Sequence, residues 1–192
     1  MFIVTELYQQ LSIIHRLAIP YWIIGGTLLG QVRHGAMIPW DDDIDIGIMK
    51  SDLELVETCL RKFIGEKENS SYQLWNTVHG LKFFNRKYPT VGTDIFIYEL
   101  IDGKIVLSSE RSRNFWKNDY FLPDELANLQ LKPFGALQVY VPNNPNRYLI
   151  LSYGSDCFTH GKLYYDHFNN RPLTSPKVPL NDIELDSVGN DF

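Results

Sequence analysis

Four aspartates lie within the five positions 41–45, in the segment DDDID, and isoleucines follow them. Two unit charges about 4 Å apart repel each other by roughly 4 kcal/mol at an effective dielectric constant of about 20. Crowded carboxylates therefore either face water or share a cation. Alternation along a strand predicts that Asp41, Asp43 and Asp45 share one face, while Asp42 lies on the other face with the isoleucines.

Asp43 and Asp45 form a pair that suits a divalent cation. Magnesium prefers hard oxygen ligands and usually keeps water and substrate phosphates in its other positions. Asp94 opens a later apolar strand in the segment TDIFIYEL, and it would face the same ion if the two strands were neighbours. We therefore predict a Mg²⁺ (or Mn²⁺) site. The alternatives are a solvated turn or helix cap for Asp41 and Asp42, and an ordinary strand-end residue for Asp94.

Gly25, Gly26 and Thr27 end a predicted strand and open a predicted helix, with Thr27 near its N-cap. Backbone without side chains permits a phosphate to approach the N–H groups at a helix N-terminus. Paired glycines also mark ordinary turns, so this segment is informative only together with the acids. We predict that these three residues bind substrate phosphate.

Local cations must hold any anionic substrate, because the net charge of the chain is -5. Arg33 and His34 precede the acids, and Lys82 lies in the strand before Asp94; we predict that all three bind substrate. Arg33 suits bidentate phosphate binding. The alternatives are a surface ion pair for Arg33, a solvated strand residue for Lys82, and contact with helix C-terminal carbonyls for His34. For His79, as for His34, phosphate contact and an ordinary structural role are both open.

Hydrophobic periodicity and turn residues predict the elements that position these groups. We expect helices over residues 3–18, 27–35, 51–64, 124–128 and 146–154, strands over 21–24, 44–49, 72–78, 81–85 and 93–100, an Asp-Gly turn at 102–103 and a hairpin over 131–142. Ser51 and Glu54 form a possible capping box. This order predicts an α/β (α+β) domain around one mixed sheet flanked by helices.

Composition narrows the class of protein. The hydrophobic content of 44% is typical of a globular chain. The net charge of -5 means that no overall positive potential attracts nucleic acid or anionic membranes. Without a basic opening or a run of about 20 apolar residues, we expect neither a signal peptide nor a membrane span, and a cytoplasmic location. We expect a domain over residues 1–170 and an extended or disordered tail over 171–192, where proline and polar residues are frequent.

The segment GGTLLGQVRHGAMIPWDDDIDIGI closely resembles the signature of the LicD family in the nucleotidyltransferase superfamily. The resemblance extends to TDIFIYEL and to PDELANLQLKPFGALQVYVPNNPNRYLILSYGSD, so it covers roughly residues 20–156. The family includes bacterial phosphocholine transferases and fukutin-related ribitol-phosphate transferases. The resemblance implies a nucleotidyltransferase-type fold and transfer of a phospho-alcohol from a CDP-activated donor to a glycan hydroxyl, with release of CMP. It implies that Asp43 and Asp45 are metal ligands and that Asp94 is the third acid.

Several alternatives remain open at this stage. The same acids serve transfer of NMP from an NTP, or they persist in a non-catalytic nucleotide- or glycan-binding module. A structural Ca²⁺ site is a third alternative, although DDDID lacks the glycine and the twelfth-position glutamate of an EF-hand loop. Asp94 either completes the metal site or takes the acceptor proton as general base, and Asp41 is a second candidate for that base. The aromatic residues near the acids either pack in the core or line the site, with an acceptor groove as one possibility: Trp40, Tyr72, Trp75 and Phe84.

Overall fold

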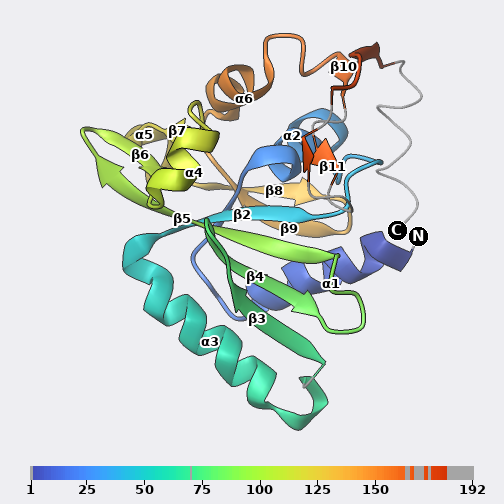
Figure 1. Ribbon diagram of the computed structural model, residues 1–192, viewed down its shortest axis with the longest axis vertical. Coiled ribbons are helices and arrows are strands. Elements are labelled where there is room, and N and C mark those ends of the chain that lie inside the picture. Colours follow the sequence, from blue (N-terminus) through green and yellow to red (C-terminus); the bar gives the residue numbers. More distant parts are fainter. Residues whose placement is uncertain (1, 70, 163–164, 167–170, 173, 181–192) are drawn as a thin grey trace.

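A mixed β-sheet runs through the middle of the molecule (Figure 1). The computed structural model describes residues 2–69, 71–162, 165–166, 171–172 and 174–180. Figure 1 shows helices α1 and α3 on one side of the sheet, and α2, α6 and the shorter helices on the other. The predicted architecture of a mixed sheet flanked by helices is thereby confirmed.

The bounds of the elements are as follows. The helices are α1 (Phe2–Arg16), α2 (Gly25–His34), α3 (Leu53–Gly65), α4 (Glu110–Phe115), α5 (Pro123–Ala127) and α6 (Pro145–Tyr153), with 3-10 turns η1 (Lys50–Asp52) and η2 (Lys67–Asn69). The strands of the main sheet are β1 (Trp22–Ile23), β2 (Ile44–Met49), β3 (Tyr72–Asn76), β4 (Gly80–Asn85), β5 (Gly92–Ile101), β6 (Lys104–Leu107) and β7 (Tyr120–Phe121). The remaining strands form two-stranded sheets: β8 (Gln130–Phe134), β9 (Leu137–Val141), β10 (His160–Gly161), β11 (Tyr165–Asp166), β12 (Arg171–Pro172) and β13 (Val178–Pro179).

The central pair of strands, β2 and β5, is parallel, and the other pairs of the main sheet are antiparallel. The strand order is β1-β2-β5-β4-β3, with β6 pairing with the later part of β5. The register between β2 and β5 places Asp45 directly opposite Asp94. Two acids 49 positions apart in the sequence thus become neighbours across one strand spacing.

The two faces of the sheet differ in character. On the face covered by α1 and α3, the isoleucines Ile44, Ile46 and Ile48 are completely buried. Their neighbours along β2 point to the opposite face, because side chains alternate along a strand. That opposite face carries Asp45 and Asp94. Burial of the isoleucines fixes the register, since a shift by one residue would exchange the two faces.

Some local predictions were wrong. Helix α3 begins at Leu53 with Asp52 at its N-cap and no side-chain cap, so Ser51 and Glu54 do not form the predicted capping box. The 3-10 turn η1 occupies the position where the box would lie. Thr27 lies inside the first turn of α2, because the helix already begins at Gly25. The predicted hairpin over residues 131–142 is confirmed by β8 and β9.

The C-terminal part of the chain is described only in pieces. Val178–Pro179 pairs with His160–Gly161, which links the end of the described chain to the segment after α6. Residues 181–192 of the predicted tail lie outside the described residues, and the division near residue 170 stays a prediction. Among the described helices, none has the length and apolar character needed to cross a bilayer.

Candidate functional site

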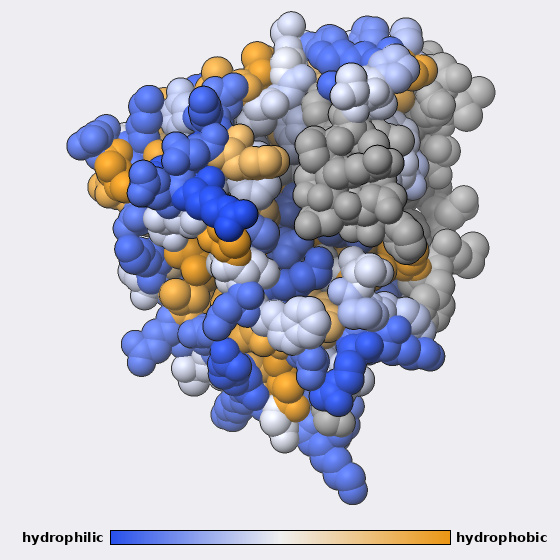
Figure 2. Space-filling model, viewed as in Figure 1, coloured by the Kyte–Doolittle hydropathy of each residue, from blue (hydrophilic) through white to orange (hydrophobic). Residues whose placement is uncertain are grey.

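Three carboxylates meet where β2 and β5 begin. Oxygen atoms of Asp43, Asp45 and Asp94 lie within 4.8 Å of one another. Asp45 and Asp94 are register partners on adjacent strands, and Asp43 immediately precedes β2. The predicted meeting of acids from two separate segments is confirmed. Figure 2 shows a hollow with hydrophilic side chains inside it in the middle of this view, over the part of the molecule where β2 and β5 run in Figure 1.

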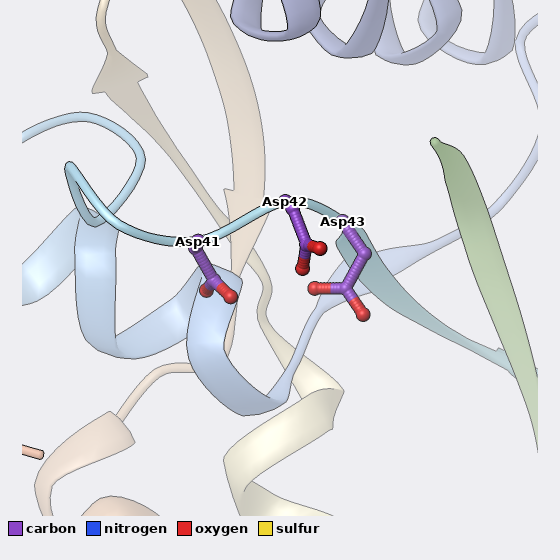
Figure 3. A group of neighbouring side chains, drawn as sticks. All are labelled: Asp41, Asp42 and Asp43. Carbon is purple, nitrogen blue, oxygen red and sulfur yellow. The ribbon is translucent and has the colours of Figure 1, made fainter. Parts of the chain in front are cut away.

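The loop before β2 extends this acidic cluster. Oxygen atoms of Asp41, Asp42 and Asp43 also lie within 4.8 Å of one another. Figure 3 shows their carboxyl groups pointing to the same side of the loop, toward the first turn of α2. The predicted orientation of Asp42 toward the isoleucine face was therefore wrong. Strand alternation does not apply to it, because β2 begins only at Ile44.

The first turn of α2 is held against the acids. The backbone N–H of Asp45 donates to Thr27 Oγ1 at 2.8 Å, and the Ile24 N–H donates to the Asp45 carbonyl at 3.1 Å. A Cβ atom on Gly25 would lie 2.7 Å from Asp45 Oδ2, and one on Gly26 would lie 2.6 Å from Asp41 Oδ2. Gly25 also has a φ of 55°. The glycine pair is therefore what permits the helix to begin this close to the carboxylates.

Two basic side chains contact Asp94. Lys82 lies directly opposite Asp94 on β4, and its Nζ is 3.4 Å from Asp94 Oδ2. His79 Nε2 is 3.6 Å from Asp94 Oδ1, and the imidazole stacks on Phe96 with a centroid distance of 4.3 Å. Lys82 thus brings a positive charge next to Asp94 from the β4 side of the site. The prediction that Lys82 binds substrate is compatible with this position, but the structure does not test it.

Arg33 bonds to its neighbour His34 and to the chain after α6. Arg33 Nε donates to His34 Nε2 at 2.9 Å, and Arg33 Nη1 donates to the carbonyls of Cys157 and His160 at 2.8 and 3.0 Å. The guanidinium also lies 5.6 Å from the ring of Trp40, which directly precedes the aspartates. These contacts connect α2 to the segment after α6. Substrate binding by Arg33 and His34 stays a prediction.

A family model described as "LicD/FKTN/FKRP, nucleotidyltransferase domain" matches residues 18–144. The chain belongs to this family. The matched region contains every acid of the cluster, Lys82 and the first turn of α2. It ends at the residue before α6.

Three relatives place this LicD chain among known proteins. The uncharacterized protein RP689 of Rickettsia prowazekii is 36% identical over 144 residues, which are 73% of this chain and 51% of the relative. The ribitol 5-phosphate transferase FKRP of Mus musculus is 27% identical over 150 residues, covering 74% of this chain and 29% of the relative. The lipopolysaccharide cholinephosphotransferase LicD of Haemophilus influenzae is 42% identical over 105 residues, which are 46% of this chain and 38% of the relative. The chain thus spans about half the length of the first relative and less of the other two.

The acids of this LicD domain repel one another. Burial raises the pKa of Asp45 well above its ordinary value, and the charges of Asp43, Asp94 and Asp41 raise it further. A cation among these carboxylates would reverse the effect, because it favours their ionised form. Clustered hard oxygen donors, all of them partly exposed, fit Mg²⁺ or Mn²⁺. The residues present are therefore suited to a divalent ion.

Asp119 of the LicD domain was not predicted from the sequence. Its carboxylate accepts hydrogen bonds from Tyr98 Oη at 2.6 Å and Tyr148 Oη at 3.1 Å, and Tyr148 Oη accepts the Gly25 N–H at 3.2 Å. Burial raises the pKa of Asp119 to about 6, although the two tyrosine hydrogen bonds lower it. Asp119 is thus connected through Tyr148 to the first turn of α2. No local pattern signals this contact, because its members come from four separate segments.

Proposed function

We propose that this chain is a metal-dependent transferase that moves a phospho-alcohol from a CDP-activated donor to a hydroxyl of a glycan, with CMP as the leaving group. The observation that supports this best is the cluster of Asp43, Asp45 and Asp94 within the region matched by the family. FKRP and LicD, a ribitol 5-phosphate transferase and a cholinephosphotransferase by name, support the reaction class.

In this proposal, Asp43, Asp45 and Asp94 hold one or two Mg²⁺ or Mn²⁺ ions. A divalent ion bound there supplies neutralisation of the charge that develops on the phosphates and on the leaving group. The chain's own residues contribute position and charge. Lys82 adds a fixed cation next to Asp94, which matters because phosphoryl transfer depends mainly on positioning and charge neutralisation.

The donor phosphates would lie at the first turn of α2. Backbone N–H groups and the positive end of a helix dipole favour an anion there. Gly25 and Gly26 present no side chain toward the acids, so a phosphate can approach the backbone. Thr27 fixes the distance between this turn and β2 through its bond to the Asp45 N–H.

The acceptor hydroxyl must lose its proton as its oxygen bonds to phosphorus. The P–O bond to CMP breaks with its electron pair remaining on CMP, and the proton passes to a carboxylate. Asp94 and Asp41 are the two candidates for this general base. Asp94 contacts Lys82 and His79 on the β4 side, whereas Asp41 lies next to Gly26 on the α2 side. Comparing the pH–rate profiles of Asp94→Asn and Asp41→Asn would separate them.

The test incubates the protein and Mg²⁺ with CDP-choline, CDP-ribitol, CDP-glycerol or NTPs, with a panel of oligosaccharides as acceptors. Mass spectrometry then measures CMP, pyrophosphate and the mass added to the sugar. We expect CMP and a phospho-alcohol on the sugar with one CDP donor, and neither product with Asp45→Asn. Pyrophosphate and a nucleotidyl sugar would instead indicate NMP transfer. A protein that binds no Mg²⁺-nucleotide would be a non-catalytic module.

A further inference from the structure

A row of four side chains crosses the sheet through the acidic cluster. Trp75 on β3 is the register partner of Lys82 on β4, Lys82 is the partner of Asp94 on β5, and Asp94 is the partner of Asp45 on β2. Register partners on neighbouring strands point to the same face of a sheet. The row therefore leads from the edge strand β3 to the acids on one face of the sheet, and Figure 1 shows these strands side by side.

Trp75 presents a supported aromatic surface on this row. Trp75 is 54% exposed, whereas the neighbouring residue Phe84 is 1% exposed. The two rings meet edge to face at a centroid distance of 4.5 Å and an interplanar angle of 71°. Phe84 thus limits the orientations of the indole. Gln73, two residues before Trp75 on the same strand, places an amide on the same face.

We infer that Trp75 binds a pyranose ring of the acceptor glycan. This inference rests on the proposed function, which places the donor phosphates at the first turn of α2. In an in-line displacement the attacking oxygen arrives opposite the leaving group. The acceptor therefore approaches the acids from the side away from α2, and β4 and β3 lie on that side.

The spacing of the row indicates the length of the acceptor. Trp75 lies two strands away from Asp94, which is about 9.6 Å at the usual separation of hydrogen-bonded strands. That distance exceeds the length of a single sugar ring and matches the length of two linked rings. One ring stacks on the indole, whose negative face attracts the C–H groups of a sugar. The next ring then brings its hydroxyl to Asp94, with Lys82 between the two rings as a hydrogen-bond donor.

The test measures glycan binding separately from transfer. Asp45→Asn protein, which we expect not to transfer, is applied to an array of mono-, di- and trisaccharides of hexoses and N-acetylhexosamines. We expect binding of at least one disaccharide or trisaccharide, and roughly tenfold weaker binding after a further Trp75→Ala change. Trp75→Phe should restore most of the affinity. Phe115→Ala is the matched control, because it removes the ring of a residue on α4 that is 62% exposed, and it should leave the affinity unchanged.

Three results would overturn the inference: no array sugar binds, Trp75→Ala binds as tightly as its parent, or monosaccharides bind as tightly as disaccharides. A higher KM for the CDP donor in Trp75→Ala, with an unchanged acceptor KM, would show that the indole binds the donor base instead. Release of CMP by the single variant Trp75→Ala distinguishes the two proposals. If release persists while sugar binding does not depend on Trp75, the proposed function stands and this inference fails.

Discussion

The surroundings of Glu125 and of the site acids Asp43, Asp45 and Asp94 are opposite in kind. Glu125, at the start of α5, is 3% exposed and has donors on both oxygens. Arg147 Nε lies 2.6 Å from Glu125 Oε1, Arg147 Nη2 lies 2.5 Å from Oε2, and the Leu122 N–H also donates to Oε2 at 2.7 Å. In the site, by contrast, Asp43, Asp45 and Asp94 face one another.

The difference separates acids that stabilise the fold from acids suited to binding. The ion pair with Glu125 raises the pKa of Arg147, which means that the two charges stabilise each other. The site acids do the reverse, since their mutual repulsion and burial raise the pKa of Asp45. An arrangement that costs folding free energy is typical of functional sites, where a ligand supplies the compensating charge.

The largest expected effect comes from Asp45→Asn. Removing one of the crowded charges should lower the rate of transfer about 1000-fold. This value is the upper end of the loss in kcat that follows removal of one electrostatic group from an active site. The same change should leave the melting temperature in the absence of metal unchanged or raised, because it relieves repulsion. CMP release and thermal unfolding without divalent ions are the measurements. A variant that loses stability in proportion to activity would place Asp45 with Glu125 as a structural acid.

The converse change is Glu125→Ala. It leaves Arg147 without its carboxylate partner, and loss of one member of a buried pair costs about 3 kcal/mol or more of unfolding free energy. Urea unfolding measures this loss, and the specific activity of the folded protein should persist. Glu57→Ala is the matched control, because Glu57 pairs with Arg61 on the exposed side of α3 and should cost below about 0.5 kcal/mol. Equal effects of the two changes would contradict the comparison.

The acids show how far the sequence could predict this site. Asp43, Asp45 and Asp94 were predictable, because each lies beside a run of isoleucines whose burial determines which face of the strand meets the acids. Asp42 was assigned to the wrong side, since nothing in DDDID marks the residue at which the strand begins. The start of α3 was misplaced for a similar reason, because a 3-10 turn and a helix satisfy the same residue pattern.

Asp119 and Tyr148 were beyond prediction from one sequence. Their contacts with Tyr98 and Gly25 depend on how β5, α2 and α6 pack together, and packing leaves no periodic signal in the sequence. The same holds for the Glu125–Arg147 pair, whose members are 22 residues apart. Pattern reasoning thus finds acids attached to regular strands, and it misses polar groups that tertiary contacts bring together.

Asp119 sharpens the comparison, because burial also raises its pKa, whereas the side-chain partners of its carboxylate within the described residues are the hydroxyls of Tyr98 and Tyr148. Its pKa is about 6 in the folded protein, against an ordinary value of 3.8. Between about pH 4 and 6 the folded state keeps a proton that the unfolded state has lost, so stability must fall as pH rises. A shift of this size corresponds to about 3 kcal/mol.

Urea unfolding of the wild type and of Asp119→Asn between pH 4 and 7 measures this dependence. The wild-type slope also contains a contribution of the same sign from Asp45. Because the charge of Asp119 adds to the rise in the pKa of Asp45, the difference between the two proteins reports Asp119 together with its effect on Asp45. We expect a flatter profile for Asp119→Asn over that range. Identical profiles would mean that the tyrosine hydrogen bonds keep Asp119 ionised over this range.

The smallest expected effect concerns the space between α2 and the acids. A Cβ atom on Gly26 would lie 2.6 Å from Asp41 Oδ2, the end of a side chain that can rotate away. Gly26→Ala should therefore fold normally, since alanine also favours the helix by about 1 kcal/mol. It should nevertheless lower transfer roughly tenfold, equivalent to about 1.4 kcal/mol, by displacing Asp41 and narrowing the approach for phosphate. Gly65→Ala is the control, because a Cβ atom there meets nothing within 4 Å. Full activity of Gly26→Ala would mean that the close approach of α2 serves packing alone, and the contrast with Glu125 would then apply only to Asp43, Asp45 and Asp94.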